Sequence, residues 1–135
     1  TFPTESGKAK FIYHPIPNLT HLRENEFQLL SVRSEGQFNT VVYEDEDLYR
    51  GQDRRDVVLM NKNDMGIIGV LNNERVTVKS KTGKIHSVLA RPFNIKRGTV
   101  LMYYPEVNSL ISRDVDPMSR TPGFKSTLVT VHPYL

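Results

Sequence analysis

The sequence predicts a mainly β domain, built as a closed β-barrel of about six short strands with short helical connections. Three observations predict it. Short runs of strand-forming residues recur along the chain, the two segments of helical character are brief, and no long amphipathic helix is present. The chain has 135 residues, which is enough for one domain with a core of its own.

Residues 1–24 are expected to form an N-terminal arm or linker that comes from a longer parent subunit. The segment is rich in proline and polar residues, and each residue before a proline is pushed toward an extended conformation. Within it, Lys10–Tyr13 is a short strand candidate. The start shows neither an initiator methionine nor a signal-peptide pattern, so we expect a cut inside a longer polypeptide. The barrel domain is then expected over residues 25–135.

The strands of the barrel are predicted from short apolar or alternating runs. Val57–Met60 is apolar throughout, as expected for a strand that is buried on both faces. Alternation over Arg75–Ser80, followed by a Lys-Thr-Gly turn and a second run, predicts a hairpin. The expected strands are Phe27–Val32, Thr40–Tyr43, Val57–Met60, Arg75–Ser80, 84–93, 98–104 and 126–135.

Two short helices are predicted between the strands. Over residues 61–71, Asn61, Asn63 or Asp64 can take the N-cap position ahead of apolar residues. Over residues 105–112, Pro105 suits the first helical position. Helices this short are marginal in water by themselves, so we expect both to pack against the barrel.

Composition and charge exclude several kinds of site and favour one kind of partner. The chain has no cysteine, which excludes a disulfide scaffold, a cysteine nucleophile, a thiolate metal site and iron–sulfur ligation within these residues. This fits a reducing compartment, and we expect a cytoplasmic location. The net charge of +3 favours an anionic partner such as phosphate or a nucleotide. No apolar run approaches the roughly 20 residues that a membrane span needs.

Neither catalytic residues nor metal ligands are predicted in this chain. The four histidines show no metal-binding spacing and no triad order, so each is expected at the surface or satisfied on a strand. Tyr43–Asp56 is rich in carboxylates but lacks the spacing of a calcium loop. We expect a solvated loop in which Arg50, Arg54 and Arg55 face the acids.

Two polar segments are the candidate binding loops. The first is LLSVRSEGQFNT, where Arg33 offers a two-pronged donor to phosphate and Gly36 lets backbone N–H groups approach a ligand. The second runs from Tyr103 to Ser126, and a loop of that length in a compact domain is usually functional or disordered. We expect the two segments to meet at one mouth of the barrel, where such folds often bind ligands.

Four segments carry a family resemblance. They are FPTESGKAKF, LLSVRSEGQFNT, DVVLMNKNDMGIIGVLNNERVTVKSKTGKI and GTVLMYYPEVNSLISRDVDPMSRTPGFKSTLVTV. In that order they resemble the C-terminal molybdopterin-dinucleotide-binding domain of the large (alpha) subunit of molybdenum/tungsten oxidoreductases, especially the formate-dehydrogenase-like ones. The resemblance covers nearly the whole chain.

The resemblance implies a six-stranded double-psi β-barrel that holds bis(molybdopterin guanine dinucleotide). It implies that Asp64 is a structural helix cap, and that Asn73-Glu74 replaces a Gly-Asp turn because asparagine tolerates the left-handed conformation. Carried over position by position, the cofactor-binding residues would be Arg33, Ser34, Gln37, Phe38, Asn39, Thr40, Asn108, Phe124 and Lys125.

The resemblance also implies that molybdenum or tungsten is held by the parent subunit and that iron–sulfur clusters lie in other domains only. The remainder of that subunit is the expected partner, and the chain is not expected to be active alone. The alternative is an adaptor β-barrel that binds protein or nucleic acid. Aromatic residues for base stacking are available, but the basic residues are scattered, so a nucleic-acid partner is not expected.

Overall fold

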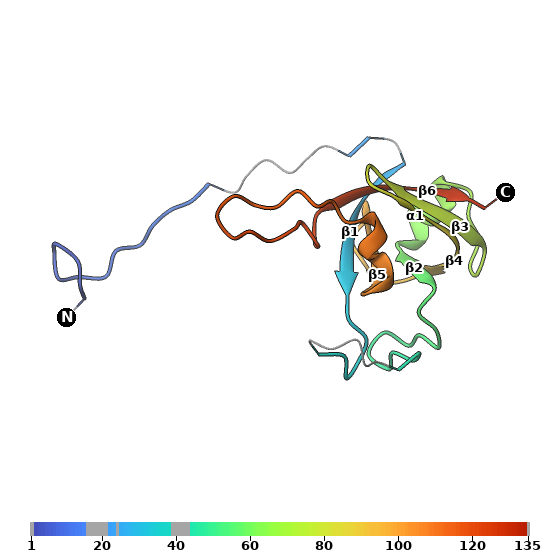
Figure 1. Cartoon of the computed structure of the whole chain (residues 1–135), viewed down its shortest axis with the longest axis horizontal. Helices are drawn as coiled ribbons and strands as arrows, with labels where there is room; N and C mark the ends of the chain where they lie inside the picture. Colours follow the sequence, from blue (N-terminus) through green and yellow to red (C-terminus); the bar gives the residue numbers. More distant parts are fainter. Residues whose placement is uncertain (1, 16–21, 24, 39–43, 135) are drawn as a thin grey trace.

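The computed structural model contains a closed six-stranded barrel (Figure 1). It describes residues 2–15, 22–23, 25–38 and 44–134. The order around the barrel is β1-β5-β2-β4-β3-β6. The strands are β1 (Glu26–Val32), β2 (Val57–Met60), β3 (Arg75–Ser80), β4 (Lys84–Pro92), β5 (Thr99–Tyr103) and β6 (Thr127–Pro133). The predicted mainly β fold class is confirmed.

The strand pairing decides which loops share an end of the barrel. β1 runs parallel to β5 and β2 runs parallel to β4, whereas the other neighbours are antiparallel. In the β1–β5 pair, Val32 is opposite Tyr103, the last residue of each strand. The segments that leave these two strands therefore start side by side.

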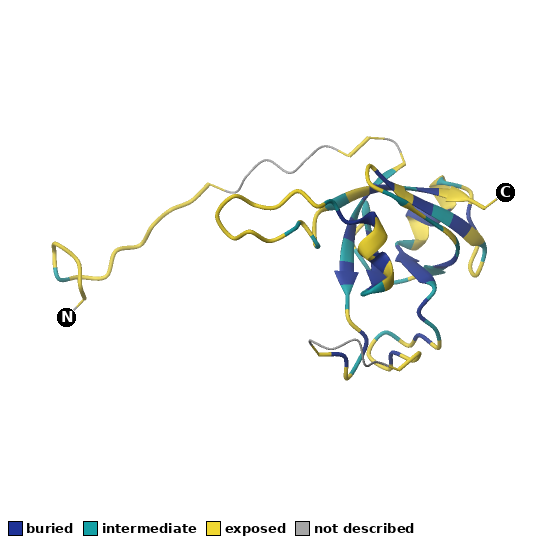
Figure 2. Ribbon diagram, in the orientation of Figure 1, coloured by how far each residue is buried: buried dark blue, intermediate teal, exposed yellow. Residues whose placement is uncertain are grey.

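Buried residues lie along the strands of the barrel and form two apolar clusters (Figure 2). All four residues of β2 are buried, as expected for an uninterrupted apolar run. β3 alternates instead, with Val76 and Val78 buried between more exposed neighbours. Burying a valine or leucine side chain stabilises a fold by roughly 1.5–3 kcal/mol, so the buried apolar residues of the strands are a main source of the barrel's stability.

The first predicted helix is shorter than expected, and it is capped by one of the asparagines predicted for that position. α1 (Lys62–Ile67) begins after Asn61, whose side chain accepts a hydrogen bond from the Asn63 N–H. The assignment of Asp64 as the cap is therefore wrong. Its buried carboxylate accepts from Arg97 Nε at 2.9 Å and from the Gly98 N–H at 2.7 Å, and so joins the helix to the turn before β5.

The second predicted helix is a single 3-10 segment, η1 (Glu106–Leu110). Pro105 is its N-cap residue, so the prediction that Pro105 takes the first helical position is wrong. Leu110 is fully buried, so the segment docks on the barrel as expected. The β3–β4 turn packs against it. A Cβ atom at Gly83 would lie 2.3 Å from the Ser109 carbonyl oxygen, so only glycine permits this contact.

Of three further predictions from the sequence, one is wrong, one lies outside the described residues and one is confirmed. Lys10–Tyr13 is not a strand; Phe11 is 99% exposed, and a strand needs a neighbouring strand to hydrogen-bond with. Thr40–Tyr43 lies outside the described residues. The Asn73 turn is confirmed, because Asn73 has a φ of 62°. In the described part of the chain, no helix has the length and apolar character to cross a membrane.

Candidate functional site

A cavity of about 610 Å³ opens where β1 and β5 end. Its wall comes from four parts of the chain: the end of β1, the residue after β5, the segment before β6 and the loop between β1 and β2. The lining residues are Ser31, Val32, Arg33, Arg50, Tyr104, Phe124 and Lys125. The two candidate loops of the sequence therefore meet at one mouth, as predicted.

The first and last loops are joined by direct contacts. The Ser31 N–H donates to the Phe124 carbonyl at 3.0 Å, and Lys125 Nζ donates to the Ser31 carbonyl. Gln28 Nε2 donates to the carbonyl of Lys125 at 3.0 Å. These bonds span more than ninety residues of sequence and hold the segment before β6 against β1.

The cavity gathers positive charge. Arg33, Arg50 and Lys125 lie in its wall, and none of the described residues that line it is acidic. Burial, together with the charges of Arg33 and Arg50, lowers the pKa of Lys125 below its ordinary value. Like charges held this close to one another favour a bound anion, which would relieve their repulsion. Tyr104 and Phe124 add aromatic surface, and the Arg33 guanidinium lies 5.7 Å from the centre of the Tyr104 ring.

A second cavity, of about 350 Å³, lies at the other end of β1 and is less suited to an anion. Its wall includes Glu26 and Asp64 and the apolar residues Ile67 and Ile68. Its wall has one cation among the described residues, Arg97, beside these two acids. Of the two cavities, the first is therefore the better candidate for an anion site.

A family model described as "Molydopterin dinucleotide binding domain" matches residues 27–128. The chain belongs to this family. The matched residues include all the residues that line the cavity. The cations and aromatic rings of the cavity wall suit a cofactor that carries phosphates and flat rings. The family membership favours the cofactor-binding interpretation over the adaptor barrel.

Relatives of the molybdopterin dinucleotide binding domain are much longer than this chain. "Protein YdeP" of Escherichia coli K12 is 31% identical over 96% of this chain, which covers 19% of that protein. The "Uncharacterized oxidoreductase Rv2900c" of Mycobacterium tuberculosis H37Rv is 31% identical over 98% of this chain, which covers 18% of that protein. The chain thus spans about a fifth of the curated relatives that it matches.

Solved structures show the same fold. Acetylene hydratase from Pelobacter acetylenicus has a TM-score of 0.60 at 17% identity, over 79% of this chain and 18% of that one. The designed apDPBB_sym_79 protein has a TM-score of 0.51 at 19% identity, over 82% of this chain and 97% of that one. The barrel of the binding domain is therefore a double-psi β-barrel, as the resemblance implied.

Only some of the residues that were expected to bind the cofactor line the cavity. Arg33, Phe124 and Lys125 line the cavity. Ser34 and Gln37 are buried within the first loop, whereas Phe38 and Asn108 are exposed and are not among the cavity-lining residues. Asn39 and Thr40 lie outside the described residues.

Arg50 and Tyr104 complete the cavity wall, but neither was among the cofactor-binding residues predicted from the sequence. The prediction that Tyr43–Asp56 is a solvated loop is wrong for three of its described members. Asp47 is 1% exposed, Arg55 is 7% exposed and Gln52 is also buried. The expected pairing of arginines with local acids holds for Arg50 with Asp47 and for Arg54 with Asp56, whereas Arg55 pairs with Glu106.

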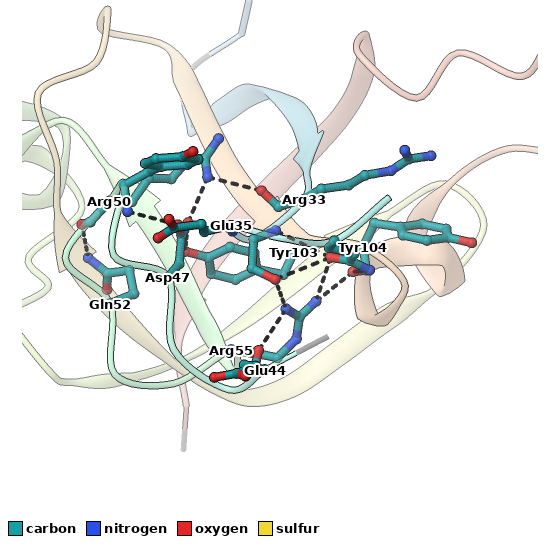
Figure 3. Close-up of polar contacts among 12 residues, drawn as sticks. Arg33, Glu35, Glu44, Asp47, Arg50, Gln52, Arg55, Tyr103 and Tyr104 are labelled. Atoms are coloured by element: carbon teal, nitrogen blue, oxygen red, sulfur yellow. Dashed lines mark hydrogen bonds and ion pairs between the residues drawn. The ribbon is translucent and has the colours of Figure 1, made fainter. Parts of the chain in front are cut away.

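Buried polar groups around Tyr103 connect the loop to the barrel (Figure 3). Tyr103 Oη donates to Asp47 Oδ2 at 2.7 Å, and Arg50 Nη1 donates to the same oxygen at 2.6 Å. Burial and the Asp47 carboxylate raise the pKa of Tyr103 well above 10, so its hydroxyl remains a donor. Burial by itself would raise the pKa of Asp47, but the hydrogen bonds from Arg50 and Tyr103 outweigh it, and the pKa is lowered.

The lowered pKa of Asp47 predicts an acid sensitivity. Its contribution to stability is present above the unfolded value of 3.8 and is lost as the pH falls through the lowered folded pKa. We expect the free energy of unfolding, measured by urea titration between pH 6 and pH 2, to fall less steeply below about pH 4 in Asp47→Asn than in the wild type. Parallel curves for the two proteins would contradict this. Asp45→Asn removes an exposed aspartate of the same loop and serves as the control.

Proposed function

We propose that the cavity at the ends of β1 and β5 binds molybdopterin guanine dinucleotide within a molybdenum or tungsten oxidoreductase. The proposal is supported above all by one observation: three cationic side chains and two aromatic rings line one cavity in a chain of the molybdopterin dinucleotide binding domain family. The name of a relative, an uncharacterized oxidoreductase, agrees with the reaction class.

The chemistry of the lining residues assigns their roles. Arg33, Arg50 and Lys125 would bind phosphate oxygens, because cationic donors form the strongest hydrogen bonds to anions. Tyr104 and Phe124 would lie against flat ring systems. Ser34 and Gln37 would act from inside the loop, since both are buried and hydrogen-bonded to it. Direct contacts from Phe38, Asn39, Thr40 and Asn108 stay predictions of the resemblance.

The bound cofactor would supply the metal and the pterin redox chemistry, and the chain would bind and orient it. In this proposal residues 25–135 are the binding domain, residues 1–24 are an arm, and the rest of the parent subunit supplies the metal ligand and the iron–sulfur cysteines. A formate-dehydrogenase-like substrate, the bis form of the cofactor and a cytoplasmic location belong to the same proposal and stay predictions.

The test is cofactor retention by the intact parent protein after Arg33→Ala and Lys125→Ala are combined. A hydrogen bond to a charged group is worth about 1.5–3 kcal/mol, so losing two should weaken binding by about a hundredfold or more. Molybdenum or tungsten content and guanine nucleotide released by acid hydrolysis are both expected to drop together.

The control combines Lys81→Ala with Lys84→Ala. It removes two exposed lysines of the β3–β4 hairpin, so it matches the change in net charge away from the cavity. Full cofactor occupancy in the Arg33/Lys125 variant, equal to that of the control, would show that the proposed site is wrong.

A further inference from the structure

A buried arginine holds together the two segments that leave β1 and β5. Arg55 lies just before β2, and its guanidinium donates to the Tyr104 carbonyl at 2.6 Å (Figure 3). It also donates to Ser34 Oγ at 2.7 Å and to Glu106 Oε1 at 2.6 Å. It also lies 5.0 Å from the centre of the Tyr103 ring. One side chain thus contacts the first loop, the end of β5 and η1 at once.

The first loop is also bonded to the Tyr104 carbonyl. Gln37 Nε2 donates to the Tyr104 carbonyl at 2.9 Å, and the Ser34 N–H donates to Gln37 Oε1 at 3.2 Å. Residues 33–38 belong to no strand, so these side-chain bonds set their conformation in place of a strand ladder. Arg33, which lines the cavity, is carried at the start of this loop.

A buried aspartate anchors the other arginine of the cavity wall. Asp47 Oδ2 accepts from Arg50 Nη1 at 2.6 Å, and Asp47 Oδ1 accepts from the Glu35 N–H at 3.4 Å. Arg50 Nη1 also donates to the Arg33 carbonyl at 3.0 Å. The head of Arg50 is therefore attached both to the barrel, through Asp47 and Tyr103, and to the backbone of the first loop.

Such anchoring is needed because the cavity cations repel one another. Long arginine and lysine side chains have many rotamers, and mutual repulsion favours those that separate the charges. An anion site works only when its donors are held in place by packed, hydrogen-bonded neighbours. Here the buried groups that do so carry charge and are themselves fully engaged, which makes the arrangement rigid.

We infer that Arg55 and Asp47 are positioning residues of the anion site: Arg55 sets the loop that carries Arg33, and Asp47 sets the guanidinium of Arg50. Neither lines the cavity, so each acts through another residue. The inference rests on the proposed function, because it assigns these two residues to the same site.

The test compares Arg55→Lys and Asp47→Asn with matched controls in the intact parent protein. Arg54→Lys makes the same substitution one residue away, in an exposed pair with Asp56. Asp53→Asn neutralises an exposed aspartate that pairs with Arg91. Lysine at position 55 keeps the charge but cannot reach Ser34, Tyr104 and Glu106 together, because it lacks the planar fork.

Two measurements separate positioning from general stability. Amide hydrogen exchange of residues 33–37 and 44–50 should quicken by about tenfold or more in both variants while exchange in β1 and β5 stays as in the controls. The affinity of the cofactor-free parent protein for inorganic pyrophosphate should fall by about ten- to a hundredfold, as for other residues that orient a binding group.

The outcomes are distinct. If exchange quickened equally in the barrel strands, the two residues would be general stabilisers and the inference would be wrong. It would also be wrong if the variants bound pyrophosphate as tightly as the controls do. If wild-type protein binds no pyrophosphate and the Arg33/Lys125 variant keeps its cofactor, the proposed function fails, and the inference fails with it. If that variant loses its cofactor but Arg55→Lys and Asp47→Asn bind like wild type, only the inference fails.

Discussion

Replacing Arg55 by methionine should lower the free energy of unfolding by about 1.5–3 kcal/mol. The Arg55 side chain is 5% exposed, and its removal would leave Ser34 Oγ without a donor and the Tyr104 carbonyl with Gln37 as its remaining donor. Leaving buried polar groups unpaired costs far more than the net worth of the bonds themselves. Methionine fills part of the space, so the loss of hydrogen bonds dominates over the loss of volume. Urea unfolding of the 135-residue chain measures the change.

Arg54→Met is the matched control for this loss. Its guanidinium pairs with Asp56 on an exposed surface, where such pairs are worth about 0–1 kcal/mol. A second comparison adds Glu106→Leu to Arg55→Met, which removes the carboxylate partner as well. Since the Glu106 side chain is 36% exposed and can be hydrated, this should recover only a small part of the stability. Equal effects of Arg54→Met and Arg55→Met would contradict the buried role of Arg55.

Much of the barrel could be predicted because its strands carry local patterns. The apolar run of β2 and the alternation of β3 report burial directly, and their predicted bounds agree with the structure. Lys10–Tyr13 has a similar local pattern but does not form a strand, because pairing depends on a distant partner. The C-terminal end of α1 has a local cause that the apolar pattern does not reveal. Gly69 follows the helix with a φ of 69°, the left-handed conformation that commonly ends helices.

The residues of the candidate binding site were harder to predict from the sequence than the strands were. The convergence of Arg33 and Lys125 could be expected from two polar segments at strand ends and from the family resemblance, and both line the cavity. Arg50, Asp47 and Arg55 could not be told from the other charges of an acidic, solvated loop. The burial of Asp47 and Arg55 depends on residues far away in sequence, since Tyr103 is 56 positions from Asp47. Charge alternation along a loop carries no information about such contacts.

Reversing the charge of Lys125 should reduce cofactor retention in the parent protein by more than a hundredfold. Lys125→Glu removes a cationic donor, worth about 1.5–3 kcal/mol toward an anion, and sets a carboxylate against the bound phosphates, which costs several kcal/mol more. Arg33 and Arg50 would then bind this carboxylate in place of the ligand, because all three side chains line the same cavity. Metal content and released guanine nucleotide measure retention.

Lys81→Glu makes the same change in net charge at an exposed turn outside the cavity, so a general electrostatic effect would appear in both variants. The local effect should also depend differently on salt. Attraction between a solvent-exposed site and a distant anion is screened over about 10 Å at 0.1 M ionic strength, whereas a carboxylate in contact with the ligand is screened little. The deficit of Lys125→Glu should therefore persist at high salt. If the two variants retained equal amounts of cofactor at every salt concentration, Lys125 would not contact the cofactor.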